Sequence, residues 1–158
     1  MAYILDTNIV RKLLFHFPKK GKYFETVWER LEDEMKKGEV YSVDECYNEL
    51  INQFSKDNDA IKWISERKAI FKNPTSEESL TIRKLFMNPK MRESIHSKNI
   101  INNRPSADVY IASKGKATGD TIVTEEEFKP NSAQLPNICD ELGVSYINFD
   151  DFMERLME

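Results

Sequence analysis

Residues 2–8 read Ala-Tyr-Ile-Leu-Asp-Thr-Asn, a short apolar run followed at once by residues that favour turns and helix caps. A similar run, Thr-Ile-Val-Thr-Glu-Glu-Glu, occupies residues 121–127. Both runs predict short buried strands that end in polar residues. Helical patterns separate such strands along the chain. We therefore expect an α/β fold, a single three-layer α/β/α domain over residues 1–158 with a central, mostly parallel sheet.

Other segments predict the remaining elements. Ser42 and Glu45 form the S-x-x-E pattern of a capping box, which predicts that a helix starts at Ser42. Residues 88–104 contain Pro, Asn and Ser and are the best candidate for a mobile loop. Further helices are expected at 22–37, 57–71, 76–87, 106–118, 136–142 and 150–157, and further strands at 40–41 and 144–147.

Composition narrows the class of protein. No apolar stretch approaches the roughly 20 residues that cross a bilayer, and the N-terminus lacks a basic segment with a cleavage site, so we expect a soluble, cytoplasmic protein. Cys46 and Cys139 are far apart and form no CxxC pair, which favours buried thiols in a reducing compartment. The net charge of −4 argues against a general nucleic-acid binder, unless bound cations reverse the sign locally.

Acidic residues follow the predicted strands. Asp6 ends the first strand, and Glu125 and Glu126 follow the strand at 121–124. Asp108 lies in the first turn of the preceding helix, and Glu49 lies beside a buried helical stripe. Each acid alone has a structural explanation, such as a helix cap or a solvated face. Acids that converge on one end of a sheet, however, repel one another and favour a hard divalent cation.

Four motifs occur in the order found in PIN domains, nucleases best known as the toxins of VapBC-type toxin–antitoxin pairs. They are Leu5-Asp6-Thr7-Asn8, Tyr47-Asn48-Glu49-Leu50, Ser106-Ala107-Asp108-Val109-Tyr110-Ile111-Ala112 and Ile122-Val123-Thr124-Glu125-Glu126-Glu127-Phe128. The stretch Leu135-Pro136-Asn137-Ile138-Cys139 also resembles an uncharacterised bacterial branch of PIN-like proteins. The resemblance covers essentially the whole chain.

This resemblance implies an acidic site formed by Asp6, Glu49, Asp108 and Glu126. Asp6, Asp108 and Glu126 would be the ligands of Mg²⁺ or Mn²⁺, and Glu49 would bind through water or orient the nucleophile. The family usually has Asp at the last position, where this chain has Glu, and Glu125 is an adjacent competitor. Polar support would come from Thr7, Asn8, Thr124 and Glu125. Arg11, Lys12, Lys114 and Lys116 are candidates for steering the phosphate backbone.

The function that the resemblance implies is metal-dependent hydrolysis of RNA phosphodiester bonds by an endoribonuclease, as the toxin of a toxin–antitoxin pair. An antitoxin would then cover the acidic rim, and homodimers are common in the family. Three alternatives remain open. They are a catalytically silent PIN-like module that acts through a protein partner, a phosphoryl-transfer domain of response-regulator type, and a nuclease that acts on DNA. The sequence lacks GxSxG, GxxxxGK[ST] and GxGxxG motifs, which argues against serine hydrolases and nucleotide-cofactor enzymes.

Overall fold

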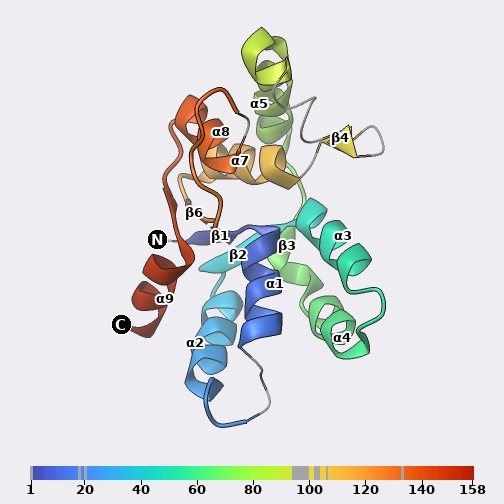
Figure 1. Cartoon of the computed structure of the whole chain (residues 1–158), viewed down its shortest axis with the longest axis vertical. Coiled ribbons are helices and arrows are strands. Elements are labelled where there is room, and N and C mark those ends of the chain that lie inside the picture. The colour runs from blue at the N-terminus through green and yellow to red at the C-terminus, as the bar shows by residue number, and fades with distance from the viewer. Residues whose placement is uncertain are drawn as a thin grey trace.

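The computed structural model describes residues 2–17, 19, 21–93, 100–101, 104–105, 107–132 and 134–158. Five strands form a parallel sheet in the order β3-β2-β1-β6-β7 (Figure 1). The strands are β1 (Tyr3–Leu5), β2 (Val40–Val43), β3 (Phe71–Lys72), β6 (Thr121–Val123) and β7 (Tyr146–Ile147). A separate antiparallel pair joins β4 (Ile100–Ile101) to β5 (Arg104–Pro105).

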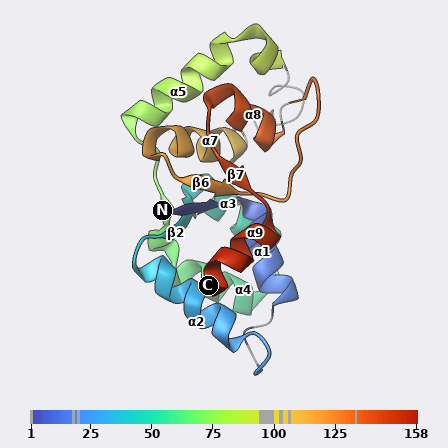
Figure 2. The same ribbon diagram turned by 90° about the vertical axis from the view of Figure 1, so that its left-hand side faces the viewer.

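Helices cover both faces of the sheet (Figure 2). On one face lie α1 (Thr7–His16), α2 (Glu25–Lys36), α4 (Asn58–Glu66) and α9 (Phe149–Met157). On the other lie α5 (Ser76–Met87), α7 (Ala107–Thr118) and α8 (Leu135–Leu142). Helix α3 (Asp44–Gln53) contacts both α1 and α7, and the 3-10 helix η1 (Lys68–Ile70) precedes β3. The predicted three-layer α/β/α fold with a central parallel sheet is confirmed.

The central strands are buried because both of their faces are covered. Ile4 and Leu5 of β1 and Ile122 and Val123 of β6 are fully inaccessible to solvent. Burying one such aliphatic side chain contributes about 1.5–3 kcal/mol, so these short strands are held mainly by packing. Their continuous apolar pattern follows from this double coverage.

The carboxyl ends of the three central strands are tied together. The Asp6 amide donates to the Val123 carbonyl oxygen at 3.1 Å, which aligns the end of β1 with the end of β6. The Ser42 hydroxyl donates to the Leu5 carbonyl oxygen at 2.7 Å, which fixes β2 on the other side. The chain proceeds from β1 to β2 in one direction and later returns to β6 on the opposite side, so strand order reverses at β1. Ligands of parallel sheets bind at such a switch point.

The capping box predicted at Ser42 and Glu45 is wrong. Ser42 lies inside β2, paired with Phe71 of β3, and α3 begins at Asp44 without a side-chain cap. The helix predicted at 57–71 includes Phe71, which in the structure begins β3 and pairs with Ser42. A capping box does form at the start of α5, where Thr75 and Glu78 exchange backbone-to-side-chain bonds of 3.3 and 3.0 Å.

Two further predictions, the loop at 88–104 and the helix cap at Ser106, concern residues that the structure describes only in part. Of the loop expected at 88–104, residues 94–99, 102 and 103 lie outside the described residues, as does Ser106, the expected cap of α7. Among the helices that the structure describes, none has the length and apolar character needed to traverse a lipid bilayer.

Candidate active site

Asp6 occupies the N-cap position of α1, yet its carboxylate makes no capping hydrogen bond. Its Oδ2 atom instead accepts a hydrogen bond from the Thr124 hydroxyl at 3.0 Å, across a separation of 118 residues in the sequence. Only 3% of Asp6 is exposed. A cap would direct the carboxylate into the first turn of α1, so the simple helix-cap interpretation fails, and the side chain faces the end of β6.

The surroundings of Asp6 disfavour its charge. Burial raises the pKa of this carboxyl to about 7, and the negative charges of Glu126 and Glu49 add to the effect. The Thr124 hydroxyl and the Thr7 backbone amide oppose it. A buried carboxylate with two further acids in electrostatic range needs either a proton or a cation to be stable.

Glu49 links three helices at this end of the sheet. Its Oε2 atom accepts from the Thr7 hydroxyl of α1 at 2.7 Å. Its Oε1 atom accepts from the Ala107 amide, the first of α7, at 3.1 Å. Glu49 itself belongs to α3, so its carboxylate brings the starts of α1 and α7 to the same place. This contact explains why Asp108, the next residue of α7, reaches the rim that carries Asp6.

Asp108 and Asp6 have a neighbour in common, the Cys139 side chain. Asp108 is 9% exposed and sits in the first turn of α7. Burial raises the pKa of the Cys139 thiol on α8 to about 12, and the charges of Asp140, Asp108 and Asp6 add to it. Cys139 therefore lies within electrostatic range of both Asp6 and Asp108. Cys46 is affected by Asp6 in the same way, and both cysteines are free and buried, as predicted.

The two neighbouring glutamates after β6, Glu125 and Glu126, have different partners. The Glu126 amide donates to the Thr124 hydroxyl oxygen at 3.1 Å, and its carboxylate accepts from the Leu135 amide at 2.7 Å, at the start of α8. Glu126 also acts directly on the Asp6 charge. Glu125 instead forms an ion pair with Lys12 at 3.0 Å. Both side chains of this pair are solvent-exposed, Glu125 at 42% and Lys12 at 35%. Of the two, Glu126 is the one whose charge raises the pKa of Asp6.

Comparisons with known proteins concern the family and the fold of the chain. The family model described as "Domain of unknown function (DUF4411)" matches residues 3–158. The chain belongs to the DUF4411 family. The fold of this DUF4411 protein is similar to that of a chain in the crystal structure of VapBC2 from Rickettsia felis bound to a DNA fragment from their promoter, with a TM-score of 0.55. The two chains are 20% identical over 95% of this chain and 100% of the other, a likeness that concerns the fold. No curated protein matches the chain.

Several predicted residues take other places in the DUF4411 fold. Lys114 is wrong as a phosphate-steering residue, because it is 5% exposed and paired with Glu78 at 2.9 Å. Arg11 and Lys116 are exposed, and Lys12 lies over the Phe149 ring at 4.4 Å besides its pairing with Glu125. Asn8 is half-buried in the first turn of α1, and among the described residues no hydrogen bond joins it to the four acids.

Sequence reasoning missed two features that hold the acids in place. Ser42 anchors the end of β1, and the amide at the start of α8 binds Glu126. The Pro136 in the first turn of α8 signals a helix start, but it does not indicate which side chain binds there. In chemical terms the Glu49 and Glu126 carboxylates and the Thr124 hydroxyl supply oxygen atoms close to Asp6, and carboxylate oxygens suit a hard cation.

Proposed function

We propose that this DUF4411 protein is a divalent-cation-dependent endoribonuclease whose acidic site consists of Asp6, Glu49, Asp108 and Glu126. The observation that carries the proposal is the buried Asp6 carboxylate, set at the switch point of the sheet, with its pKa raised by burial and by two neighbouring acids. Maintaining like charges in a buried place costs stability, and a purely structural role does not account for that cost.

The chemistry of the four side chains fits Mg²⁺ or Mn²⁺. All of their donors are carboxylate oxygens, which these hard ions prefer. Within the described residues, no three His, Cys, Asp or Glu side chains converge closely enough to hold an ion as they stand. Glu49 and Glu126 are held instead by the Ala107 and Leu135 amides. Ion binding therefore requires a rotamer change in at least one of these acids.

Each side chain has a distinct part in the proposed reaction. Asp6, Asp108 and Glu126 would hold the cation, which when bound supplies charge neutralisation and an activated water. The Thr124 hydroxyl orients Asp6, and the Thr7 hydroxyl orients Glu49. Glu49 would position the attacking water and receive its proton, since one of its oxygens accepts from Thr7 and the carboxylate retains further lone pairs.

The likeness to VapBC2 supports a toxin–antitoxin setting for this activity. The partner would be an antitoxin that covers the acidic rim, and a basic side chain placed among the carboxylates is a physically sensible inhibitor. The substrate would be single-stranded or looped RNA, and the protein would act as a monomer or a homodimer.

The test is cleavage of a fluorescent RNA by the purified protein with Mn²⁺, Mg²⁺ or EDTA. Asp6→Asn and Asp108→Asn should each lower cleavage by roughly 100-fold or more, because each removes a cation ligand. Asp33→Asn is the matched control, since Asp33 is an exposed residue of α2 that pairs with Lys37 at 2.8 Å. Wild-type cleavage rates in both folded site variants would overturn the proposal.

A catalytically silent PIN-like module is the second candidate. The observation that favours it is the lack of a converged set of three ligands among the described residues. Calorimetry with Mn²⁺ separates the two candidates, because a silent module gives no binding heat and no change on Asp6→Asn. Running the cleavage assay on matched DNA oligonucleotides separates an RNA nuclease from a DNA nuclease.

A further inference from the structure

A hollow of about 430 Å³ adjoins the acidic site at the carboxyl ends of β6 and β7. It shares Thr124 and Glu126 with that site, so whatever enters it lies beside the four acids. The volume falls within the roughly 300–1,000 Å³ of typical small-molecule sites. Its remaining walls are the segment after β6 and the first turn of α9.

Two aromatic side chains line this hollow. Phe128, in the segment after β6, is 52% exposed, and Tyr146 of β7 is half-buried. Covering an exposed phenyl ring with a ligand is favourable, because it removes apolar surface from water. Flat aromatic faces beside a phosphodiester-cleaving site are the surfaces on which unpaired nucleic-acid bases stack.

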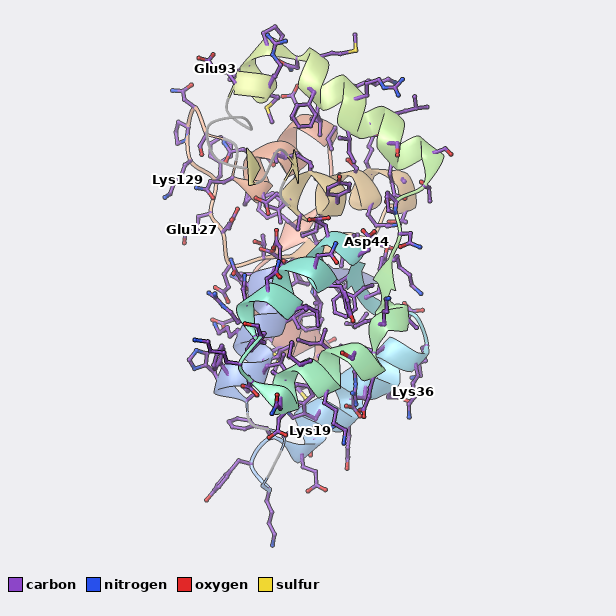
Figure 3. The ribbon with its side chains drawn as sticks, turned by 90° about the vertical axis from the view of Figure 1, so that its right-hand side faces the viewer. Lys19, Lys36, Asp44, Glu93, Glu127 and Lys129 are labelled. Atoms are coloured by element: carbon purple, nitrogen blue, oxygen red, sulfur yellow. The ribbon has the colours of Figure 1, made fainter. Side chains whose placement is uncertain are left out.

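The polar lining consists largely of hydrogen-bond acceptors. Glu127, Asp150 and Asp151 contribute exposed carboxylates, and Glu127 projects outward from the segment that follows β6, as Lys129 does (Figure 3). The cation in the lining, Lys12, is already paired with Glu125. Asp150 and Asp151 lie in the first turn of α9, whose positive end offsets part of their charge.

This lining selects among nucleic-acid groups. Phosphate is repelled by the carboxylates and belongs at the cation site. A neutral base with adjacent N–H donors fits, because one carboxylate can accept from two donors side by side. Guanine presents such a pair on its Watson–Crick edge. Uracil presents one donor between two carbonyl oxygens, which the carboxylates disfavour.

We propose that this hollow is a nucleobase subsite that takes guanine, stacked on Phe128 and bound at its Watson–Crick edge by Glu127. The inference rests on the proposed nuclease function and deepens it. It makes the protein a ribonuclease that prefers guanosine beside the scissile phosphate.

The first experiment measures nucleoside binding by NMR chemical shifts, with isotopically labelled wild-type protein in EDTA. Nucleosides are used because they carry no phosphate. Guanosine should bind roughly tenfold more tightly than uridine and shift the resonances of residues 125–128 and 146–151. Phe128→Ala and Glu127→Gln should each weaken guanosine binding by about tenfold, in line with the loss of one stacking or one bidentate contact. Phe15→Ala and Glu77→Gln are matched controls, since both residues are exposed and lie on other elements.

The second experiment compares cleavage of RNAs that differ in a single base beside one cleavage point. The wild type should prefer guanosine, and Phe128→Ala should lose the preference while it still cleaves. Equal binding of guanosine and uridine, or guanosine binding that both variants retain, would overturn the subsite. So would saturable binding of hexa-arginine in the hollow with no binding of guanosine, which identifies a basic peptide as its ligand. Base-indifferent cleavage overturns the subsite alone, whereas guanosine binding without any cleavage overturns the nuclease function.

Discussion

At the scale of single residues, Asp6 makes the stability of the fold depend on pH. Its carboxyl has a pKa near 7 in the fold, against 3.8 for an unperturbed Asp. Between these values the folded state binds more protons than the unfolded state, so the free energy of unfolding falls as pH rises. The stabilising contribution is complete below about pH 4 and is lost as pH passes through 7. A side chain kept for stability alone would not have this profile.

The residue-scale prediction concerns Asp6→Asn in EDTA. Asn is the neutral isostere of the protonated carboxyl, so the variant should lack the pH-dependent loss of stability. At pH 8 it should unfold at a temperature several degrees above wild type, since a shift of this size corresponds to a few kcal/mol. The measurement is thermal unfolding by circular dichroism from pH 5 to 8. Parallel pH profiles for the variant and wild type would show that Asp6 is not the titrating group.

At the scale of elements, the position of α7 decides where Asp108 lies. Gly115 of α7 packs closely on its neighbours, because an added Cβ would lie 2.6 Å from Val144 Cγ1 and 3.2 Å from Ile122 Cδ1. On the other side, the Lys114 ammonium bonds Glu78 of α5 and, at 2.9 Å, the carbonyl oxygen of Asn73, which lies between β3 and α5. The Lys114 and Glu78 side chains are only 6% and 2% exposed. These contacts hold α7 between the sheet and α5.

The element-scale prediction concerns this buried ion pair. Lys114→Met should lower the free energy of unfolding by about 3–5 kcal/mol, because it leaves the Glu78 charge buried without its partner. The double variant Lys114→Met/Glu78→Gln should recover most of the loss, since Gln is neutral and still completes the capping box with Thr75. Urea unfolding of the two variants checks this. Additive or worse losses in the double variant would mean that the ion pair does not account for the effect.

At the scale of the whole molecule, the proposed acidic site joins parts of the chain that are far apart. Asp6 follows β1, Glu49 lies on α3, Asp108 starts α7 and Glu126 follows β6. An ion held by three of these acids would therefore crosslink elements from both ends of the sequence. Binding to the folded state alone stabilises it, by about 3 kcal/mol at one hundred times the dissociation constant.

The prediction at this scale is that saturating Mn²⁺ raises the unfolding temperature of the wild type by roughly 5–10 °C at pH 7.5. The shift should be largely absent in Asp6→Asn and Asp108→Asn, which lack a ligand. Differential scanning calorimetry with and without Mn²⁺ measures it, and Asp33→Asn should respond as wild type does. An equal shift in all four proteins would place the ion outside the acidic site.

The sequence by itself determined the fold class, the helix at residues 76–87 and the set of acids at strand ends. These features are local, because apolar runs, helical periodicity and the residues that follow a strand are all visible within short windows. Resemblance to PIN domains then predicts that these acids share one site.

Only the tertiary structure decided which neighbour each side chain meets. It bound the Glu126 carboxylate to the Leu135 amide, paired Glu125 with Lys12, buried Lys114 against Glu78, and held Ser42 in β2 rather than at a helix cap. The physical reason is that these contacts join segments far apart in the sequence, as Thr124 and Asp6 are. Glu125 and Glu126 are adjacent and have the same side chain, so their local propensities are the same. Only the tertiary surroundings distinguish their roles.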